Sequence, residues 1–278
     1  MRWLKNVNRI YVDAYKNYGL GHLIRTQTIA EGLGAFETNI NKFLAKRSEV
    51  SIIDSYRAYY RHYENISKLS RISVFLDDFN RITYPKGILI NMAFNAKKIV
   101  KQKNTLNLLG IDYVPIRKEF LEVKSADKKH ILLILGGLDV KGYSYEIEKL
   151  PFDFLVVTAN KEIAKKCKNV LFNPSAKDLA RAFADSLLAV SAAGMTLYEL
   201  NYLQIPTIAI KVAKNQTGVY EFQKRGFIKD VFEKVNINDI KKSIEWHLNN
   251  YDMVLNRYTH KLIDGYGVKR IIEAIKKG

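Results

Sequence analysis

Cysteine is nearly absent from this chain of 278 residues, since Cys167 is the only one. A single thiol excludes a disulfide framework within the chain and is typical of a protein in the reducing cytoplasm, where we expect this one to be. Long apolar runs are missing as well. The first residues, Met1–Asn8, lack the apolar core of a secretory signal, and the longest runs, such as Ile131–Leu135, are as long as a strand. We therefore expect no stable insertion into a membrane.

Metal-binding patterns are also lacking. No His-x-His or His-Glu-x-x-His spacing occurs, and no Asp-x-Asp motif is present. The sequence therefore predicts neither a metal site nor a cofactor. The histidines are scattered along the chain: His22, His62, His130, His247 and His260.

The charge balance is strongly basic, with 45 Lys and Arg against 28 Asp and Glu and a net charge of +17. Such a surface attracts nucleic acid, anionic lipid or anionic small molecules. The lysines are spread over separate segments, which is typical of solvated helix faces. No recognition helix, zinc finger or aromatic RNA-binding strand pair stands out, so we expect no nucleic-acid partner. A diphosphate ligand and a docking patch for a membrane surface both stay open.

The length and a hydrophobic content of 47% suit two α/β domains. Short apolar runs bounded by turn residues predict buried strands. These runs are Arg9–Val12, Val50–Ile53, Ile72–Leu76, Ile88–Asn91, Ile131–Leu135, Phe154–Thr158, Ser186–Val190 and Pro206–Ile210.

Helical patterns alternate with these strands, which indicates parallel sheets with helices on both faces. The predicted helices are His22–Leu33, Arg57–Leu69, Arg117–Val123, Lys177–Ala184, Met195–Leu203, Gln216–Arg225, Asn238–Asn249 and Tyr266–Lys277. The polar stretch Lys124–Lys129 predicts a boundary between a domain of residues 1–125 and a domain of residues 126–278, with the last helix packing back on the first. We expect an α/β protein of two doubly wound, Rossmann-like domains that face each other across a cleft. Ligands of such folds bind beyond the carboxyl ends of the strands.

The loop after the first strand carries an unusual set of residues. Gly19 and Gly21 permit close backbone approach to a ligand, but Ile24 stands where a dinucleotide fingerprint would have its third glycine. His22 falls at a helix start, where the helix dipole favours a neutral imidazole that can accept a proton from water. Arg25 lies on nearly the same helix face. His22 could equally be an ordinary polar residue at a helix N-terminus.

Two loops of the second half suit a phosphate ligand. Gly136 and Gly137 follow a buried strand and can offer N–H groups to an anion, although a plain tight turn explains them equally well. The small residues Ser191–Gly194 precede a helix start near Met195, whose N–H groups would face a pyrophosphate. Glu199, one turn further on, could accept hydrogen bonds from ribose hydroxyls or be a surface carboxylate.

Taken together, these loops resemble the UDP-sugar hydrolase family of pseudaminic acid biosynthesis, within the glycosyltransferase-B superfamily. The matching pieces run in family order over roughly residues 8–230. They are Gly19–Arg25, Ile52–Tyr56, Leu76–Asp78, Pro115–Phe120, Gly136–Asp139, Ser191–Glu199 and Asn215–Gln216.

The resemblance implies that water attacks the anomeric carbon of UDP-2,4-diacetamido-2,4,6-trideoxy-β-L-altropyranose and releases UDP and the free sugar with inversion. His22 would be the base, and Asp13 would orient the imidazole or the sugar. Residues implied to bind the sugar are Gly19, Gly21, Arg25, Asp54, Tyr56, Asp77, Asp78, Asn91, Asn95 and Arg117. Those implied to bind UDP are Gly136, Gly137, Asp139, Ser191, Ala193, Gly194, Met195, Thr196, Glu199, Asn215 and Gln216.

Two departures from the family pattern lie in the first domain. Ser55 stands where family members usually carry histidine, and the interval from His22 to Asp54 is short, as though a strand–helix unit were missing. Two other functions therefore stay open: a glycosyltransferase that uses a UDP-sugar donor, and a protein that binds a nucleotide sugar without turnover. We expect a monomer whose partner is a UDP-linked sugar.

Overall fold

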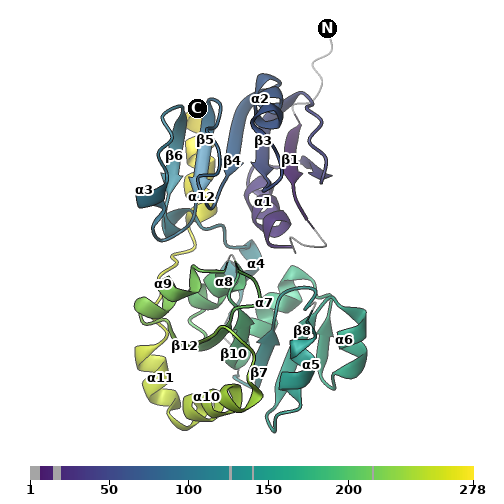
Figure 1. The fold of residues 1–278 in the computed structure, drawn as a ribbon, viewed down its shortest axis with the longest axis vertical. Helices are drawn as coiled ribbons and strands as arrows, with labels where there is room; N and C mark the ends of the chain where they lie inside the picture. Colours follow the sequence, from purple (N-terminus) through teal and green to yellow (C-terminus); the bar gives the residue numbers. More distant parts are fainter. Residues whose placement is uncertain (1–6, 15–19, 125–126, 140, 215) are drawn as a thin grey trace. The chain divides into compact units, whose positions relative to one another are not determined.

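The computed structural model describes residues 7–14, 20–124, 127–139, 141–214 and 216–278. The chain divides into two compact units (Figure 1). Unit 1 comprises Met1–Ile116 and Asp264–Gly278, and unit 2 comprises Arg117–Ile263. Unit 2 is thus an insertion in the chain of unit 1.

Unit 1 is built on a six-stranded sheet of order β2-β1-β3-β4-β5-β6, in which every neighbouring pair is parallel. Its strands are β1 (Asn8–Val12), β2 (Phe36–Ile40), β3 (Ser48–Asp54), β4 (Ser70–Leu76), β5 (Gly87–Asn91) and β6 (Thr105–Leu109). Its helices are α1 (Gly21–Glu31), α2 (Tyr60–Lys68), α3 (Ala96–Ile99), the 3-10 turn η1 (Ile111–Tyr113) and α12 (Gly267–Lys277).

Unit 2 has a second six-stranded parallel sheet, of order β12-β11-β10-β7-β8-β9. Its strands are β7 (His130–Ile134), β8 (Phe154–Thr158), β9 (Val170–Phe172), β10 (Ser186–Ala192), β11 (Thr207–Ile210) and β12 (Ile228–Phe232). Its helices are α4 (Lys118–Glu122), α5 (Tyr143–Glu148), α6 (Lys161–Lys166), α7 (Ala176–Ala184), α8 (Thr196–Tyr202), α9 (Val219–Lys224), α10 (Ile237–Asn249) and α11 (Tyr251–Arg257).

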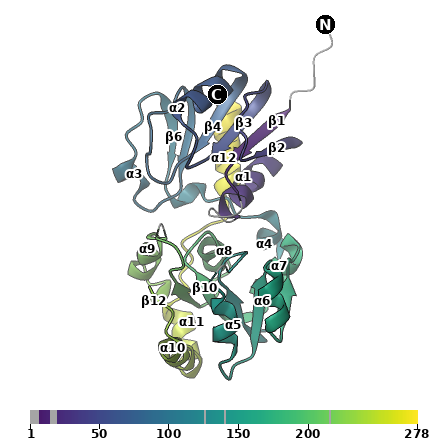
Figure 2. The same ribbon diagram turned by 45° about the vertical axis from the view of Figure 1, so that its right-hand side comes forward.

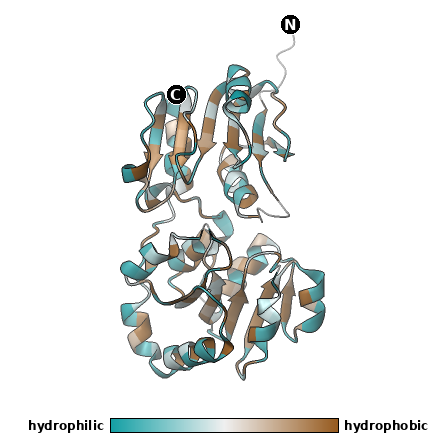
Figure 3. Ribbon diagram, viewed as in Figure 1, coloured by the Kyte–Doolittle hydropathy of each residue, from teal (hydrophilic) through white to brown (hydrophobic). Residues whose placement is uncertain are grey.

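The central strands are apolar along their length because helices cover both faces of a parallel sheet (Figure 3). In β7, for example, Ile131–Ile134 are all buried. The predicted fold class, two doubly wound α/β domains, is confirmed, and each of the eight predicted strands is present within one or two residues of its expected bounds. The strands that the sequence analysis missed are β2, β6, β9 and β12, and each of them is the outer strand of its sheet.

In each sheet the order in which strands are added reverses once, and this reversal creates a topological switch point. In unit 1 the chain goes from β1 outward to β2 and then returns to the other side of β1 to form β3. In unit 2 it goes from β7 through β8 to β9 and returns beside β7 as β10. Crevices for ligands in open α/β sheets form at such points, outside the carboxyl ends of the strands. The loops after β1 and β3, and after β7 and β10, are therefore the first places to look for a site.

The return from β2 to β3 explains the short interval between His22 and Asp54. Residues 41–47 join the two strands without a helix, although a crossover between parallel strands usually contains one. Unit 1 therefore has a doubly wound sheet with one crossover helix missing.

The chain crosses between the units at 116/117 and at 263/264, whereas the sequence placed the boundary at 125/126. The difference arises because α4 packs on unit 2, where Phe120 meets Phe183 of α7 with ring centroids 5.1 Å apart. The last helix, α12, forms part of unit 1 and lies beside α1 (Figure 2).

Both chain ends of unit 2 are bonded to α8. The Arg117 guanidinium, at the first residue of the unit, donates to Glu199 at 2.7 and 2.8 Å. Near the other end, the buried Asn201 amide donates to the His260 carbonyl and accepts from the Leu262 and Ile263 amides at 2.8–3.0 Å. One short helix therefore fixes the two points at which unit 2 begins and ends.

We expect Gly267→Ala to destabilise unit 1. A Cβ at Gly267 would lie 2.0 Å from the carbonyl oxygen of Val114, so α12 would have to move. The gain in helix propensity, under about 1 kcal/mol, is smaller than the overpacking penalty of about 1–3 kcal/mol. Urea unfolding followed by circular dichroism measures the change.

Gly218→Ala is the matched control, because a Cβ there meets nothing within 4 Å. Equal unfolding midpoints for the two variants would contradict the close contact between Gly267 and Val114.

Candidate functional site

The polar residues at the carboxyl edge of the unit 1 sheet form one connected network around Arg25. Arg25 and His22 come from the first turns of α1, and Asp54 ends β3. Arg25 Nε donates to Asp54 Oδ2 at 2.5 Å and Nη2 donates to Oδ1 at 2.8 Å. His22 Nδ1 lies 2.7 Å from Asp54 Oδ1. A spacing of three residues on a helix thus brings a base and a cation to the same carboxylate.

The outer edge of the guanidinium donates to Asp78, which lies in the loop after β4. Arg25 Nη1 lies 2.9 and 3.1 Å from the two carboxylate oxygens of Asp78. The Tyr56 hydroxyl donates to Asp78 Oδ2 at 2.7 Å, and the Tyr56 ring meets His22 edge-on with centroids 4.5 Å apart. The sequence predicted His22, Arg25, Asp54, Tyr56 and Asp78 separately, and the structure brings these five together.

The network fixes the charge states of its members. Burial alone would raise the pKa of Asp54, but the charges of Arg25 and His22 and their hydrogen bonds outweigh burial and lower that pKa to about 2. Burial disfavours the charge of Arg25 too, and the two carboxylates overcome it, so its pKa stays well above the ordinary value. Burial and the charge of Asp78 raise the pKa of Tyr56, which keeps its hydroxyl protonated as a donor.

The geometry assigns the tautomer of His22. The ionised Asp54 can only accept, so Nδ1 of His22 carries the proton and donates to it. Arg25 Nη2 lies 3.1 Å from the same Nδ1, but both groups are donors and this approach is no hydrogen bond. In the neutral imidazole, Nε2 is then the nitrogen with the lone pair, as a general base requires.

Asp13 directly follows β1, and its buried side chain contacts the loop after β3. Asp13 was expected to orient the imidazole or the sugar, but the carboxylate beside the imidazole is that of Asp54. Asp13 Oδ2 accepts from the Ser55 hydroxyl at 2.7 Å and from the Tyr56 amide at 2.9 Å. The side chain of Arg57 donates to Asp13 Oδ1 at 2.9 and 3.0 Å. Ser55, which stands where the family usually has histidine, thus forms part of this loop anchor.

Asp77 shapes the loop after β4. Its carboxylate accepts from the amides of Phe79 and Arg81 at 2.8 and 2.6 Å and from the Tyr84 hydroxyl at 2.7 Å. The acidic pair therefore divides its roles: Asp77 fixes the backbone while Asp78 meets Arg25.

The remaining sugar-site predictions lie outside the network. Asn91 ends β5 fully buried; its Oδ1 accepts from the Ala93 amide at 2.9 Å, and its Nδ2 is buried without a hydrogen-bond partner. Asn95 is exposed and precedes α3. Gly21 begins α1, and Gly19 lies outside the described residues.

In unit 2, Glu199 and Arg117 form a bidentate pair with both side chains largely buried. Arg117 was expected among the sugar-binding residues of the first domain, whereas it lies in unit 2. Its guanidinium also lies 4.6 Å from the centre of the Phe120 ring. Each carboxylate oxygen keeps a further lone pair, so Glu199 can still accept from a ligand hydroxyl.

The loop after β7 combines a permissive backbone with a helix cap. Gly136 has φ +86°, a conformation that side chains rarely adopt. Gly137 follows it, and its carbonyl accepts from the Ala159 amide at 2.7 Å. Asp139 accepts from the amides of Tyr143 and Ser144 at 3.2 and 2.8 Å, so its carboxylate holds the start of α5.

The loop after β10 is built from small, mostly buried residues. Ser191 and Ala193 are buried, Gly194 follows, and Met195 and Thr196 begin α8. Gln216 Nε2 would lie 3.6 Å from a Cβ on Gly194, and Gln216 Oε1 accepts from the Val212 amide at 2.9 Å. Asn215 lies outside the described residues.

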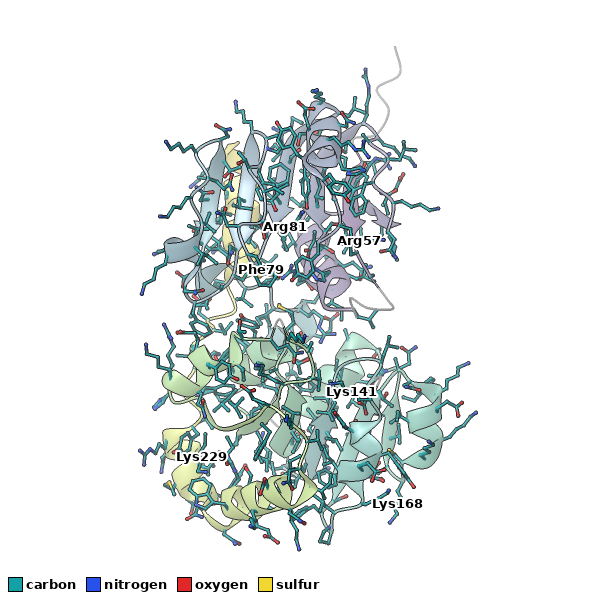
Figure 4. All side chains as sticks on the ribbon, in the orientation of Figure 1. Arg57, Phe79, Arg81, Lys141, Lys168 and Lys229 are labelled. Carbon is teal, nitrogen blue, oxygen red and sulfur yellow. The ribbon has the colours of Figure 1, made fainter. Side chains whose placement is uncertain are left out.

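The structure adds two arginines that the sequence analysis missed, Arg57 and Arg81 (Figure 4). Arg81 donates to the carbonyls of Ser55 and Ala58 and to the Tyr63 hydroxyl, each at 3.0 Å. An arginine a few residues beyond a strand end is the only sequence signal of this role, and it is a weak one.

The described part of the chain lacks a metal-binding cluster, a membrane-spanning helix and a reactive thiol. Within the described ranges, no three His, Cys, Asp or Glu side chains gather as a metal site would need. The helices of the same ranges are all too short or too polar to cross a bilayer. Burial, with Glu148 and Asp139 nearby, raises the pKa of Cys167 to about 11, so its thiol is protonated at neutral pH.

We expect Asp54 to make the stability of unit 1 sensitive to acid. Its folded pKa of about 2 lies below the ordinary 3.8, so the ionised carboxylate stabilises the fold above about pH 4. This contribution, on the order of 2 kcal/mol, is lost as the pH falls from about 4 through about 2. Asp54→Asn should lower the stability at pH 7 and flatten this part of the pH profile, as measured by urea unfolding.

The exposed Asp153→Asn is the control and should follow the parent. A parent profile that matches Asp54→Asn down to pH 3 would show that Asp54 has no special pairing.

The chain is similar to known proteins in sequence and in fold. No family model matches the chain. The chain is 23% identical over 270 residues to a Helicobacter pylori protein named pseudaminic acid cytidylyltransferase and UDP-2,4-diacetamido-2,4,6-trideoxy-beta-L-altropyranose hydrolase. That alignment covers 87% of this chain and 52% of the other, so the chain spans about half the length of this relative. An uncharacterized protein of Methanocaldococcus jannaschii is 22% identical over an alignment of 334 positions. This alignment covers 96% of the present chain and 68% of the Methanocaldococcus protein.

Solved structures with the same fold include MurG of Acinetobacter baumannii, with a TM-score of 0.61 and 10% identity over 98% of this chain and 100% of that one. The UDP-GlcNAc 2-epimerase of Neisseria meningitidis, solved with UDP-GlcNAc, has a TM-score of 0.55 and 10% identity, with coverages of 98% and 100%. The chain therefore has the glycosyltransferase-B fold, and its resemblance to the UDP-sugar hydrolase family of pseudaminic acid biosynthesis is confirmed.

Proposed function

We propose that this protein hydrolyses a UDP-linked diacetamido-trideoxy sugar to UDP and the free sugar, with inversion, in pseudaminic acid biosynthesis in the cytoplasm. The observation that carries the proposal is the contact of 2.7 Å between His22 Nδ1 and Asp54 Oδ1, which leaves Nε2 as a base. The name of the Helicobacter pylori relative includes this hydrolase activity, and the similarity covers 87% of the chain. The epimerase with the same fold binds UDP-GlcNAc.

In the proposed reaction, Nε2 of His22 accepts a proton from water as the water oxygen forms its bond to the anomeric carbon. The bond between that carbon and the diphosphate oxygen breaks, and its electron pair leaves with UDP. Asp54 stays ionised and stabilises the imidazolium that forms, as its low pKa requires. General-base catalysis of this kind contributes about 10²- to 10⁴-fold in rate.

Arg25 is a positioning residue in this scheme, because it holds the Asp54 carboxylate in the plane that His22 needs. Its bonds to Asp78 keep a second carboxylate at the same edge, with Tyr56 donating to it. Asp78 and Tyr56 are thus available to bind the sugar, whereas Asp13 and Asp77 act by shaping the loops that carry Ser55–Arg57 and Phe79–Tyr84.

Unit 2 would bind the nucleotide half. Amide groups of the loops after β7 and β10, at Gly136–Gly137 and Met195–Thr196, would stabilise the charge of the leaving diphosphate. The Gly194 amide already donates to the Ala192 carbonyl at 2.8 Å, so Gly194 would contribute by allowing close approach to the backbone. Glu199, fixed by Arg117, would accept from the ribose hydroxyls. Gln216 lies against Gly194 and supports the second of these loops.

Two other functions use the same residues and are separated by experiment. A glycosyltransferase would present an acceptor hydroxyl to His22 in place of water. A binding protein would hold the nucleotide sugar without using His22.

The first test is UDP release from the altrose-configured UDP-sugar without an acceptor. We expect the parent to release UDP, and His22→Ala to lose about 10²- to 10⁴-fold in kcat with its UDP affinity unchanged. His130→Ala is the control, since His130 lies in unit 2 with Nε2 3.1 Å from the Ala182 carbonyl.

Tight UDP binding without release would exclude the hydrolase, and release that appears only with an added acceptor would identify a transferase. Full release by His22→Ala would exclude His22 as the base.

The second test is the UDP affinity of Glu199→Gln, measured by calorimetry. The amide loses a charged acceptor for ribose and one arm of the Arg117 pair, and we expect Kd to rise about tenfold. Glu146→Gln is the control, because Glu146 forms an exposed pair with Lys149 in the same unit. An unchanged Kd for Glu199→Gln would remove Glu199 from the nucleotide site.

A further inference from the structure

Two connections of unit 1 pack against each other, and the second of them also carries Tyr56 of the Arg25 network. Residues 41–47 join β2 to β3, and residues 55–59 lead from β3 into α2. The rings of Phe43 and His62 lie 5.9 Å apart, and the Tyr59 ring stacks on His62 at 6.0 Å. Arg57 Nη2 also donates to Asn41 Oδ1 at 2.8 Å. The two segments therefore form one continuous surface.

Several apolar side chains on this surface are exposed to an unusually large extent. Leu44 is 74% exposed and Tyr59 is 68% exposed, and these are the two most exposed large hydrophobic residues in the part of the chain that the structure describes. Tyr60, next along the chain, is 46% exposed. Single exposed apolar residues are common, but three on two segments that contact each other indicate a surface that is covered in use.

The two segments themselves are basic. Segments 41–47 and 57–62 contain five Lys and Arg and no Asp or Glu. Arg57 pairs with Asp13, and the other four cations are all exposed. We call the α2 patch the following residues: Lys42, Leu44, Lys46, Arg47, Tyr59, Tyr60 and Arg61.

We propose that the α2 patch docks the protein on the surface of an anionic phospholipid bilayer. Leu44 would enter the boundary between headgroups and acyl chains, the two tyrosines would lie at headgroup depth, and the four cations would meet lipid phosphates. An exposed aliphatic side chain favours lipid over nucleic acid, because a nucleic acid offers Leu44 no apolar partner comparable with acyl chains. The docking does not depend on whether water or an acceptor cleaves the nucleotide sugar.

The test is co-sedimentation of the full chain with vesicles of phosphatidylcholine, alone or mixed with phosphatidylglycerol. We expect binding to the mixed vesicles to be at least about tenfold tighter, and to weaken with salt. The double variant Leu44→Ser/Tyr59→Ser should lose about tenfold in affinity for mixed vesicles, and Lys42→Gln/Lys46→Gln should lose several-fold. Circular dichroism checks that each variant is folded.

Two matched controls separate the patch from the bulk charge of the protein. Lys97→Gln/Lys98→Gln removes the same charge from exposed positions in α3, and Phe172→Ser removes a ring that is 44% exposed in unit 2. Both should bind like the parent. The proposal is overturned if mixed vesicles do not bind the parent, if the α3 variant loses as much as the Lys42/Lys46 variant, or if Leu44→Ser/Tyr59→Ser binds unchanged. It is also overturned if a short DNA duplex binds more tightly than the vesicles.

Discussion

The buried guanidinium of Arg25 is the group around which the carboxyl edge of the unit 1 sheet is organised. Two carboxylates, Asp54 and Asp78, come from different strands and would repel each other at this distance without a cation between them. With Arg25 between them, both carboxylates accept from a cation, His22 Nδ1 donates to Asp54, and Tyr56 has an acceptor for its hydroxyl. Arg25, one helical turn after His22, thus acts on the imidazole through Asp54, which it holds in place to accept from Nδ1.

The sequence was sufficient for the central strands of both sheets because burial on both faces produces continuous apolar runs. It failed at the outer strands for the same reason: β2 and β12 are partly exposed and carry polar residues such as Thr38 and Asp230, which remove the apolar run. For the site, the residue types and loops were predictable. The division of work among the aspartates was not, because only turn geometry decides that Asp13, Asp77 and Asp139 accept from backbone amides while Asp54 and Asp78 meet Arg25.

The two units share a topological switch point but carry different residue types at it. In unit 1 the strands around the switch point end in carboxylates, a histidine and arginines, which suit proton transfer and a polar sugar. In unit 2 the corresponding loops carry glycine, alanine and serine, whose small side chains permit close approach of a ligand to the backbone. The missing helix between β2 and β3 changes only the first of these units, and unit 2, to which we assign the nucleotide in our proposal, keeps its full set of crossovers.

The hydrogen bonds from both ends of unit 2 to α8 affect how readily unit 2 can be exchanged as an inserted domain. Because Arg117 is tied to Glu199, and the His260–Ile263 segment to Asn201, unit 2 enters and leaves its neighbour through two anchored points on one helix. A domain inserted through closely anchored ends can be transferred as a cassette into another host unit without rebuilding its own core. Any exchange of unit 2 between host units would therefore have to preserve α8, because both ends of the unit are bonded to it.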